Sequence, residues 1–556
     1  MVSEGKIPLL LTDASKARIL VILLLVLLIA TVRLYYYSGP IFANSQDEGI
    51  YLNIYAQTLI FNNPITFSQY KNVNFSNFSQ CGCNPADEFQ FYVGFIYPEM
   101  LLLKVFGFSV DLAIFYVILT SIIEGFFIFL IIEKISGIRA AALGAIVFTF
   151  LPTDVLFSTH VQPLVPAMMF ITISFYAFVI AEGQRKTLQY LYTGAFSGLA
   201  YITNPIGIAA LLFLLLASII RATDRKLKFK ELKNGAKRAA IIALGFAVVY
   251  SAVGIPYLLE SGNFFLYPDL THAVYAYQDA TQPIVTHCIS GNICLNYITG
   301  YPSFYLSILA DQQTTTDGYL RYFGISAYIL AAMVVLNLFR KNRNKWSTLF
   351  IALFLFYLLV IMFFPTKISF SGGQINYYPI GEQAYITTVL TLPLVVIIAL
   401  GVDSLFQNKK SYLRYFAIAI MLALIFYNVL DLNNDVGYYR ASMYTAHAFV
   451  NYVTQHPDSH YYAAFLFSGE ANLLSAYRYN ISSLPNCTAR YLSSLPNGTY
   501  IATGGTTSLD ISPQYTQEFD DCVLPNITSY KLIYTVHNPL ANYPQMQAPQ
   551  FSLYER

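Results

Sequence analysis

The stretch Ser45-Gln46-Asp47-Glu48-Gly49 follows closely on a hydrophobic run of about residues 18–37. Aromatic residues end this run, at Tyr35, Tyr36 and Tyr37, and one more, Phe42, lies between the run and Ser45. Tyrosine is enriched where a membrane helix meets water, so the stretch begins at a membrane surface. Ser45 and Glu48 have the spacing of a capping box, which predicts a helix over about 46–61 that Asn62-Asn63-Pro64 ends. Two adjacent carboxylates, Asp47 and Glu48, therefore stand at the edge of the membrane.

The composition is that of a membrane protein. Of the 556 residues, 56% are hydrophobic and 11% charged, whereas a soluble chain has about 25% charged residues. Apolar runs of about 18–20 residues, long enough to cross roughly 30 Å of hydrocarbon, alternate with short charged clusters. The net charge of +2 gives no indication of a nucleic-acid partner. Eleven spans are predicted, at about 18–37, 111–132, 140–156, 163–181, 188–203, 205–221, 239–257, 320–340, 347–364, 384–402 and 413–430.

The distribution of lysine and arginine predicts the orientation. The amino-terminal segment and five alternate loops hold 22 of the 32 basic residues. Basic loops stay in the cytoplasm, so the amino terminus is expected there and, after an odd number of spans, the carboxyl terminus outside. The first run is longer than the apolar part of a signal peptide and has no clear small-residue cleavage site, which favours an uncleaved anchor. We expect a multi-pass protein of the cell membrane.

Sequons and cysteines agree with this orientation. The Asn-x-Ser/Thr sequons, all in loops expected outside, are predicted glycosylation sites at Asn74, Asn77, Asn480, Asn486, Asn497 and Asn526. All six cysteines also fall outside, where disulfides persist. Proximity suggests the pairs Cys288–Cys294 and Cys487–Cys522 and leaves Cys81 and Cys83 unassigned. No CxxC pair or histidine cluster accompanies them, so zinc is not indicated.

Residues 1–430 are expected to form the membrane domain, with large exterior loops at 38–110 and 258–319. The first loop is predicted to hold a second interfacial helix, about 91–106, which is too short and too polar at its edges to cross. From Asp431 onward the periodicity changes. The 126 residues of 431–556 suffice for a small exterior α/β domain. Its predicted elements are helices at 438–454 and 470–477 and strands at 461–467, 499–503 and 531–536.

Three segments carry a resemblance to a known family. The run Asp47-Glu48-Gly49-Ile50-Tyr51 opens an interfacial helix after the first span, and 96–107 places a proline before an apolar helix that ends in Phe-Gly. A late segment runs from Ala384-Tyr385 to Leu392-Pro393-Leu394. In this order, over about 38–403, they resemble the GT-C superfamily of polyprenyl-phosphate-sugar transferases. The protein O-mannosyltransferases, aminoarabinose transferases and RgtA/B/C/D-like relatives are the most similar members.

The resemblance implies a GT-C fold, a polyprenyl-phosphate-sugar donor and Asp47 as the general base at the outer face. A carboxylate in hydrogen-bond reach of an acceptor hydroxyl can take its proton during attack, and cations or backbone N–H groups can neutralise the departing phosphate. The structural alternative is that Glu48 caps Ser45 and Asp47 only stabilises a helix amino terminus. The local sequence leaves both explanations open.

The sequence departs from the family at the phosphate contact, because Ala384 stands where relatives often carry an arginine before the late tyrosine. Arg321, Lys367 and Arg33 are the basic residues that could replace it, although each could equally be a membrane-edge anchor. The only tryptophan, Trp346, lies in a loop expected in the cytoplasm. The Trp-Trp-Asp-Tyr-Gly motif of the oligosaccharyltransferase catalytic subunit is therefore not present, which argues against en bloc glycan transfer to asparagine.

Further polar residues are weaker candidates, each with an ordinary structural explanation. Asp87 and Glu88, together with Glu48, could shape the acceptor site, but the first two also suit a solvated loop. The other pocket candidates are His160, Gln162, Asn204, Glu382 and Tyr385. A hydrogen-bonded interface histidine, an Asn-Pro turn and an abundance of tyrosine explain most of these equally well. Glu124 lies inside a span, too deep for chemistry at the surface, and is expected to be a structural acid.

The sequence thus predicts a mainly α polytopic membrane glycosyltransferase, hexosyltransferase-like, that moves a sugar from a polyprenyl phosphate to a hydroxyl of a protein, lipid or glycan outside the cytoplasm. A divalent metal is left open as a cofactor. Two alternatives stay open: a transporter or flippase of lipid-linked sugars, which would carry paired charges within its spans, and a degenerate GT-C-like protein without catalysis.

Overall fold

The computed structural model describes most of the chain. The described residues are 13–37, 45–71, 73, 90–184, 186–222, 229–271, 284–290, 293–298, 323, 325–338, 345–363, 365–371, 374–379, 384–408, 410–463, 471–472, 474–485, 487–504, 520–537 and 550–556. For 13–17, 45–47, 222, 229–230, 284–290, 293–298, 337–338, 362–363, 365–371, 374–379, 384–385, 438–439, 441–443, 504 and 550, the backbone alone is described.

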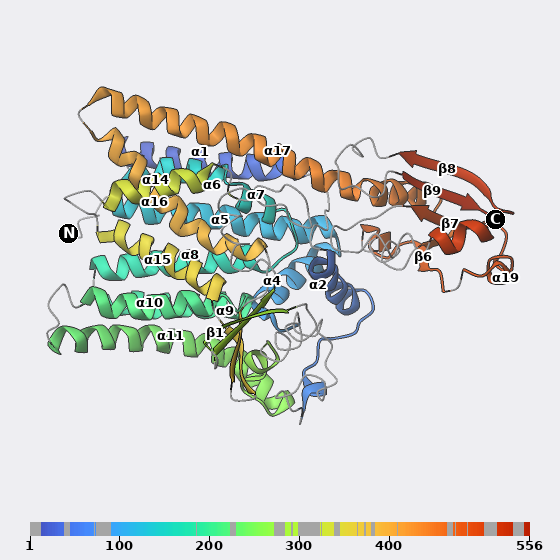
Figure 1. Ribbon diagram of the computed structural model, residues 1–556, viewed down its shortest axis with the longest axis horizontal. Helices are drawn as coiled ribbons and strands as arrows, with labels where there is room; N and C mark the ends of the chain where they lie inside the picture. The colour runs from blue at the N-terminus through green and yellow to red at the C-terminus, as the bar shows by residue number, and fades with distance from the viewer. Residues whose placement is uncertain are drawn as a thin grey trace, which may run out of the picture.

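A bundle of roughly parallel helices forms most of the molecule, and a small sheet domain projects from one end of it (Figure 1). We call this end of the bundle the domain-side end. The helices are α1 Asp13–Tyr36, α2 Ser45–Leu59, α4 Val93–Phe106, α5 Val110–Ser136, α6 Ile138–Thr149, α7 Pro152–Phe157, α8 Leu164–Gln184, α9 Thr187–Thr203, α10 Gly207–Ala222, α11 Phe229–Ser261, α14 Ser326–Leu338, α15 Lys345–Phe363, α16 Thr391–Phe406, α17 Ser411–Gln455 and α19 Ala489–Leu492. Among the described residues, 3-10 helices are η1 Ser68–Tyr70, η3 Ala384–Leu390 and η4 Leu524–Asn526.

Within the described residues, six helical stretches are long and apolar enough to cross a membrane. They are Arg18–Tyr36, Val110–Ser136, Leu164–Gln184, Glu231–Ser261, Ile386–Phe406 and Ser411–Gly437. Shorter apolar helices cover Ile138–Thr149, Gly207–Arg221, Ser326–Leu336 and Lys345–Ile361. Each of the eleven predicted spans overlaps a described helix, which confirms a mainly α membrane protein. That all eleven cross the membrane stays a prediction.

Two predicted boundaries differ from the structure. The predicted span 140–156 is divided into α6 and α7, because Pro152 disfavours helical geometry at Leu151, whose ψ is 116°. The predicted helix 438–454 is not separate from the last span: α17 continues from Ser411 to Gln455 without a proline or another break. A single 45-residue helix therefore connects the bundle with the terminal domain (Figure 1).

Both helices predicted in the first loop are present, as α2 and α4 at the domain-side end, and their place at the membrane interface stays a prediction. Soon after α2, Asn62 adopts a left-handed φ of 57°, a conformation that asparagine tolerates better than most residues. Gly107 ends α4 at a φ of 93°, which only glycine adopts easily. The turn residues that were expected to end these helices therefore do so by their backbone conformations.

Close helix packing within the bundle depends on small residues. A Cβ added to Gly194 of α9 would lie 1.8 Å from the carbonyl oxygen of Ile242 in α11. One added to Gly245 of α11 would lie 2.2 Å from the carbonyl oxygen of Leu191. The backbones of α9 and α11 can approach this closely only because both positions lack a side chain, as is common between membrane helices.

The part of the chain that the structure describes contains two sheets beside the helices. The four-stranded sheet has the order β1-β2-β4-β3 and joins two loops distant in sequence: β1 Ile284–Ser290 and β2 Ile293–Ile298 with β3 Pro365–Ser371 and β4 Gln374–Pro379. This sheet was not predicted. The five-stranded terminal sheet has the order β6-β5-β7-β9-β8, with β5 His460–Ala463, β6 Asn480–Ser483, β7 Thr499–Gly504, β8 Lys531–His537 and β9 Gln550–Glu555. The predicted strands 499–503 and 531–536 are confirmed, whereas β6 and β9 were missed.

The terminal domain contacts the first loop. Tyr477 lies edge-to-face on Phe61, with ring centroids 5.3 Å apart, and its hydroxyl donates to Asn53 Oδ1 of α2 over 3.4 Å. Ala476 and Tyr477 both have a left-handed φ, of 53° and 56°. The predicted helix 470–477 consequently ends before these two residues. The contact holds the terminal domain against the helix that carries Asp47.

Candidate functional site

The acidic pair Asp47-Glu48 lies in the first turn of α2. The side chain of Glu48 is buried, with 3% of its surface exposed. The side chain of Asp47 lies outside the described residues, so only its place on the helix backbone is defined. A buried acid on one side of this turn means that α2 is packed against the protein and is not a free surface helix.

Aromatic contacts hold α2 on α4. Tyr51 meets Phe95 edge-to-face with ring centroids 5.1 Å apart and lies 6.1 Å from the ring of Tyr92. One turn further along α2, the fully buried Tyr55 donates its hydroxyl proton to Glu99 Oε2 over 2.5 Å. Aromatic packing and one buried hydrogen bond therefore set the position of α2, and with it the position of its first turn.

Glu99 is a buried acid that the sequence did not single out. Burial raises its pKa well above the ordinary value, while the hydrogen bond from Tyr55 opposes this shift. Its Oε1 has no hydrogen-bond partner in the described part of the chain. At neutral pH we take Glu99 as a neutral carboxylic acid, because no described cation pairs with it and an isolated buried charge is costly.

A buried ion pair lies between the spans. Arg33 of α1 and Asp154 of α7 are both completely buried and form a salt bridge. Arg33 also donates to the carbonyl oxygens of Thr149 and Phe148, at 2.6 and 3.2 Å, and to Ser121 Oγ at 3.2 Å. In this arrangement every nitrogen of the guanidinium has a partner. Arg33, a candidate phosphate contact by sequence, therefore ties α1 to α5, α6 and α7.

Glu124 lies close to this ion pair. Thr172 of α8 is 3.5 Å from its Oε1, and Oε2 has no hydrogen-bond partner among the described residues. The side chain is completely buried. The Arg33–Asp154 pair therefore places paired charges within predicted spans, which is the feature expected of a transporter. The sequence analysis had singled out only Glu124 as an acid inside a span. Because every guanidinium nitrogen of Arg33 has a partner, we interpret the ion pair as a structural contact between helices and not as a transport site.

His160 and Gln162 lie in the buried turn between α7 and α8. His160 Nδ1 is 2.6 Å from the carbonyl oxygen of Leu156, so it carries the proton and leaves the Nε2 lone pair as an acceptor. Burial lowers the pKa of His160 to about 4, and the imidazole is neutral at physiological pH. Gln162 donates to the carbonyl oxygen of Phe157 over 3.0 Å. Both side chains hold the turn, as the structural explanation of the sequence expects.

The remaining candidates are spread over the domain-side end or lie outside the described residues. Asn204 follows α9, and its Oδ1 accepts the backbone N–H of Ile206 over 3.0 Å, which is ordinary turn chemistry. For Lys367 in β3 and Tyr385 in η3 the backbone alone is described. The candidates outside the described residues are Asp87, Glu88, Arg321 and Glu382. In the described ranges no three His, Cys, Asp or Glu side chains gather as a metal site.

The predicted disulfide Cys487–Cys522 is confirmed, with Cα atoms 5.8 Å apart. Cys288 and Cys294 face each other in the β1–β2 register, and their pairing stays a prediction because their sulfur atoms are not described. Among the sequons, Asn480 and Asn497 are exposed, while Asn526 donates its amide to the carbonyl oxygens of Cys487 and Cys522. Asn74, Asn77 and Asn486 lie outside the described residues.

The fold and one segment of the sequence are similar to those of known membrane proteins. Residues 95–252 match the family model described as dolichyl-phosphate-mannose-protein mannosyltransferase. The chain is similar in structure to ArnT from Cupriavidus metallidurans bound to undecaprenyl phosphate, with a TM-score of 0.51 and 12% identity over 97% of this chain and 98% of that one. The apo state of ArnT gives the same TM-score and identity over 98% of both chains. No curated protein matches the chain in sequence.

A second relative is the Archaeoglobus fulgidus oligosaccharyltransferase in complex with Zn and sulfate, with a TM-score of 0.50 and 12% identity over 87% of this chain and 68% of that one. The chain has the fold of the GT-C superfamily of membrane glycosyltransferases and resembles the mannosyltransferases and ArnT. Over residues 95–252 the chain thus resembles a family of mannosyltransferases, and over nearly its whole length it has the fold of ArnT.

Proposed function

We propose that this protein transfers a sugar from a polyprenyl-phosphate donor to an acceptor hydroxyl outside the cytoplasm, with Asp47 as the general base. The observation that carries the proposal is the position of the acidic pair. Asp47 lies in the first turn of an interfacial helix that buried Tyr55 and Glu99 hold against α4, in a chain of the GT-C fold. The family match over 95–252 begins within α4 and so includes most of this supporting helix.

In the proposed reaction, the acceptor oxygen attacks the anomeric carbon of the sugar. Asp47 takes the hydroxyl proton as the new carbon–oxygen bond forms, and the bond between that carbon and the phosphate oxygen breaks. The polyprenyl phosphate leaves with the bonding electrons. Attack opposite the leaving group inverts the configuration at the anomeric carbon. The protein must also stabilise the negative charge on the phosphate.

Arg321 and Lys367 are the basic residues we propose for that phosphate contact, because Arg33 is enclosed and fully engaged in the structure. Lys367 belongs to β3, in the sheet that follows α15. Glu48, Asp87 and Glu88 remain proposed contributors to the acceptor site, as do His160, Gln162, Asn204, Glu382 and Tyr385 to the wider pocket. The terminal domain, which touches α2 through Tyr477, is proposed to recognise or cover the acceptor.

The proposed orientation in the membrane is inferred from the distribution of lysine and arginine. The bundle end opposite the terminal domain holds the ion pairs Arg18–Glu133 and Arg139–Asp403, both at 2.6 Å. The same end holds Arg221 in the last turn of α10, and Lys233 and Arg238 in the first part of α11. A concentration of Lys and Arg at this end is typical of the cytoplasmic side. The amino terminus is therefore proposed to be cytoplasmic, and α2 and the terminal domain exterior.

The experiment uses the full-length protein in detergent with a radiolabelled polyprenyl-phosphate sugar and a panel of protein, lipid and glycan acceptors. Wild-type protein should release polyprenyl phosphate and label an acceptor without any second compartment, which a transporter cannot do. Asp47→Asn should lower the rate by about 10²–10⁴-fold, the usual contribution of a general base. Loss of the first-turn charge should cost at most about 1 kcal/mol, so α2 should remain folded.

Glu231→Gln is the matched control, because Glu231 is also a first-turn acid but lies at the opposite end of the bundle, in α11. It should transfer at the wild-type rate. Wild-type activity in Asp47→Asn would remove the assigned base while leaving the transferase class intact. No release of polyprenyl phosphate by wild-type protein with any donor sugar would overturn the transferase itself.

A further inference from the structure

An ion cluster joins α8, α10 and α11 at the end of the bundle opposite the terminal domain (Figure 1). Glu182, near the end of α8, accepts Nε of Arg221 over 3.4 Å and Nη1 of Arg238 over 3.0 Å. The hydroxyl of Tyr190 in α9 donates to the same carboxylate over 2.7 Å. Two guanidinium groups therefore share one carboxylate, which leaves the three charged groups with one unit of positive charge.

The other two ion pairs described at this end are balanced. Glu133 accepts two nitrogens of Arg18, and Asp403 accepts Nε of Arg139, so each carboxylate faces one guanidinium. The excess of one cation is therefore a property of the cluster around Glu182 and not of every ion pair at this end.

Most hydrogen-bond donors of the two arginines are not used within the described part of the chain. A guanidinium has five N–H donors, and Arg221 and Arg238 each give one of them to Glu182. The two side chains are 18% and 21% exposed, so both reach the surface of the protein. The cluster can therefore donate to a further anion without losing its existing contacts.

Trp346, the only tryptophan of the chain, lies against this cluster at the start of α15. The guanidinium carbon of Arg221 is 3.8 Å from the centroid of its ring. Further along the same two helices, the rings of Phe213 and Phe356 are 5.5 Å apart, so α10 and α15 run antiparallel side by side. Tryptophan is enriched where membrane helices meet the lipid head groups, which places the cluster at head-group level.

The surface beside the cluster is apolar. Leu212, Leu216 and Ile220 follow one another at intervals of about one turn on α10, and about half of each side chain is exposed. Leu355 of α15 is exposed to a similar degree. Both helices are apolar, so we expect these side chains to face lipid chains and not water. An apolar stripe therefore leads along α10 to Arg221.

The ligand that fits these features has an anionic head and hydrocarbon chains. Arginine binds phosphate oxygens with two parallel hydrogen bonds, and basic pockets between membrane helices bind anionic lipid heads. A zwitterionic head brings its own cation, which offsets the attraction. A phosphate ion without chains gains nothing from the apolar stripe.

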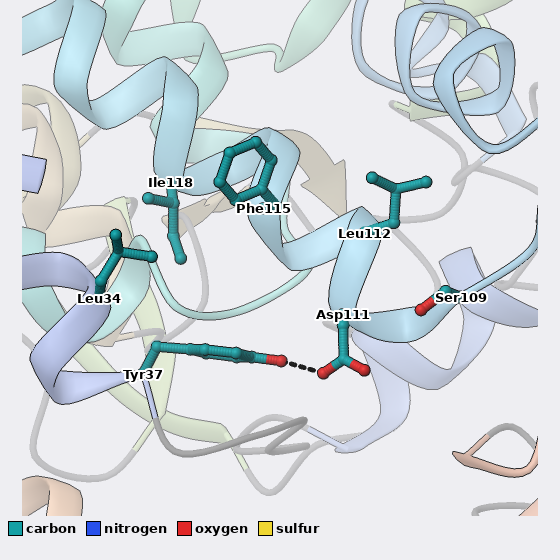
Figure 2. A pocket seen from close by; sticks show the side chains of 7 residues that line it. All are labelled: Leu34, Tyr37, Ser109, Asp111, Leu112, Phe115 and Ile118. Carbon is teal, nitrogen blue, oxygen red and sulfur yellow. Dashed lines mark hydrogen bonds between the residues drawn. The ribbon is translucent and has the colours of Figure 1, made fainter. Parts of the chain in front are cut away.

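The hollow between the domain-side ends of α1 and α5 lacks such a selection by charge (Figure 2). Its lining is mainly apolar, and none of the seven residues around it is a cation. The hydroxyl of Tyr37 donates to Asp111, as Figure 2 shows, so these polar groups already satisfy each other. Nothing in that hollow favours one kind of lipid over another.

We propose that Arg221 and Arg238 bind the phosphate of an anionic phospholipid, with Trp346 beside its head and its chains along Leu216 and Ile220. A purely structural contact between α8, α10 and α11 would need one arginine for the carboxylate and not two. The site lies at the opposite end of the bundle from α2, so it goes beyond the proposed sugar transfer and does not depend on it.

The test uses Trp346 as the reporter, because its fluorescence comes from this site alone. Full-length protein is reconstituted in phosphatidylcholine vesicles without a sugar donor. A rising fraction of phosphatidylglycerol, or in a parallel series of phosphatidylcholine, carries bromine near the head-group end of its chains and quenches the tryptophan that it touches. The wild-type site should prefer phosphatidylglycerol about fivefold, the factor that corresponds to about 1 kcal/mol for one basic charge at a membrane surface.

Three variants show whether the cluster causes the preference. Arg221→Gln should lower it about fivefold, and Glu182→Gln should raise it about fivefold by removing the carboxylate that competes with the phosphate. A loss of folding cannot imitate such a rise. Arg139→Gln is the matched control, because it removes the same charge at the same end of the bundle but from a balanced pair. It should leave the preference unchanged.

Equal quenching of the wild-type protein by the two brominated lipids would overturn the proposal, as would an equal fall in Arg221→Gln and Arg139→Gln. An unchanged preference in Glu182→Gln would reduce the cluster to a contact between helices. If excess inorganic phosphate displaces the brominated phosphatidylglycerol, the site binds the free anion and the lipid assignment is wrong. Because no donor is added, a failure of the proposed transferase activity cannot produce any of these results.

Discussion

Tyr55→Phe tests how the position of α2 is maintained. The substitution keeps the buried ring but removes the one hydrogen bond that Glu99 accepts in the described structure. Leaving a buried polar group without a partner costs about 1–3 kcal/mol. Glu99→Leu should cost a similar amount, because it leaves the buried Tyr55 hydroxyl without its acceptor.

The double variant Tyr55→Phe/Glu99→Leu removes both polar groups and should be nearly as stable as wild type. The resulting coupling energy is expected to be about 1–3 kcal/mol. Because α2 carries Asp47, a shift of about 1 Å in its first turn could lower the transfer rate by roughly 100-fold. Tyr55→Phe should therefore lower kcat more than it raises KM, and the double variant should recover part of kcat.

The assay combines unfolding of the detergent-solubilised protein with steady-state transfer from the lipid-linked donor. Tyr415→Phe is the control, because Tyr415 on α17 is 71% exposed and should tolerate the change in both measurements. If the losses of stability in the two single variants add up in the double variant, with no recovery, this hydrogen bond does not fix the position of α2. If Tyr55→Phe is less stable but keeps the wild-type kcat, the position of α2 does not determine the transfer rate.

Three further predictions concern the buried acids and the terminal domain. Arg33→Met should cost roughly 3–5 kcal/mol by leaving Asp154 buried without its cation, and adding Asp154→Leu should recover much of that stability in thermal unfolding; no recovery would contradict the pairing. The Cys487→Ser/Cys522→Ser variant should lose about 4 kcal/mol of terminal-domain stability, given the sequence separation of 35, and should be cut faster in limited proteolysis than wild type; equal rates would contradict this. Since the pKa of Glu99 is raised by folding, its proton stabilises the fold fully below the ordinary Glu pKa of about 4.3, and this contribution is lost as pH rises towards the raised value. The melting temperature of wild type relative to Glu99→Gln should therefore fall with increasing pH, and a constant difference would contradict a neutral Glu99.

The apolar helices and the two helices of the first loop were predictable because their signals are local. The length of an apolar run, the capping spacing of Ser45 and Glu48, and the stops at Asn62 and Gly107 each act within a few residues. The long last helix was divided in the prediction because its pattern changes from apolar to amphipathic near Asp431. Nothing in the backbone chemistry of that region ends a helix, and α17 continues through it.

The features that the sequence missed depend on contacts between distant residues. The sheet β1-β2-β4-β3 pairs Cys294 with Asn376, and no periodicity within either loop indicates this partner. Arg33 and Asp154 are 121 residues apart, and Tyr55 and Glu99 are 44 apart. For Arg33 and Asp154, the available sequence signal was the presence of opposite charges in or beside predicted spans. That signal could not specify which helices are in contact. The role of Asp47 was inferred from its place and from family resemblance.

The most direct test of the central claim is a structure of the full-length protein with a polyprenyl-phosphate sugar and an acceptor bound. We expect a carboxylate oxygen of Asp47 within about 2.6–3.2 Å of the acceptor hydroxyl, or linked to it by one water, at the amino end of α2. An Asp47 side chain turned towards open water, with the sugar bound elsewhere, would contradict the account.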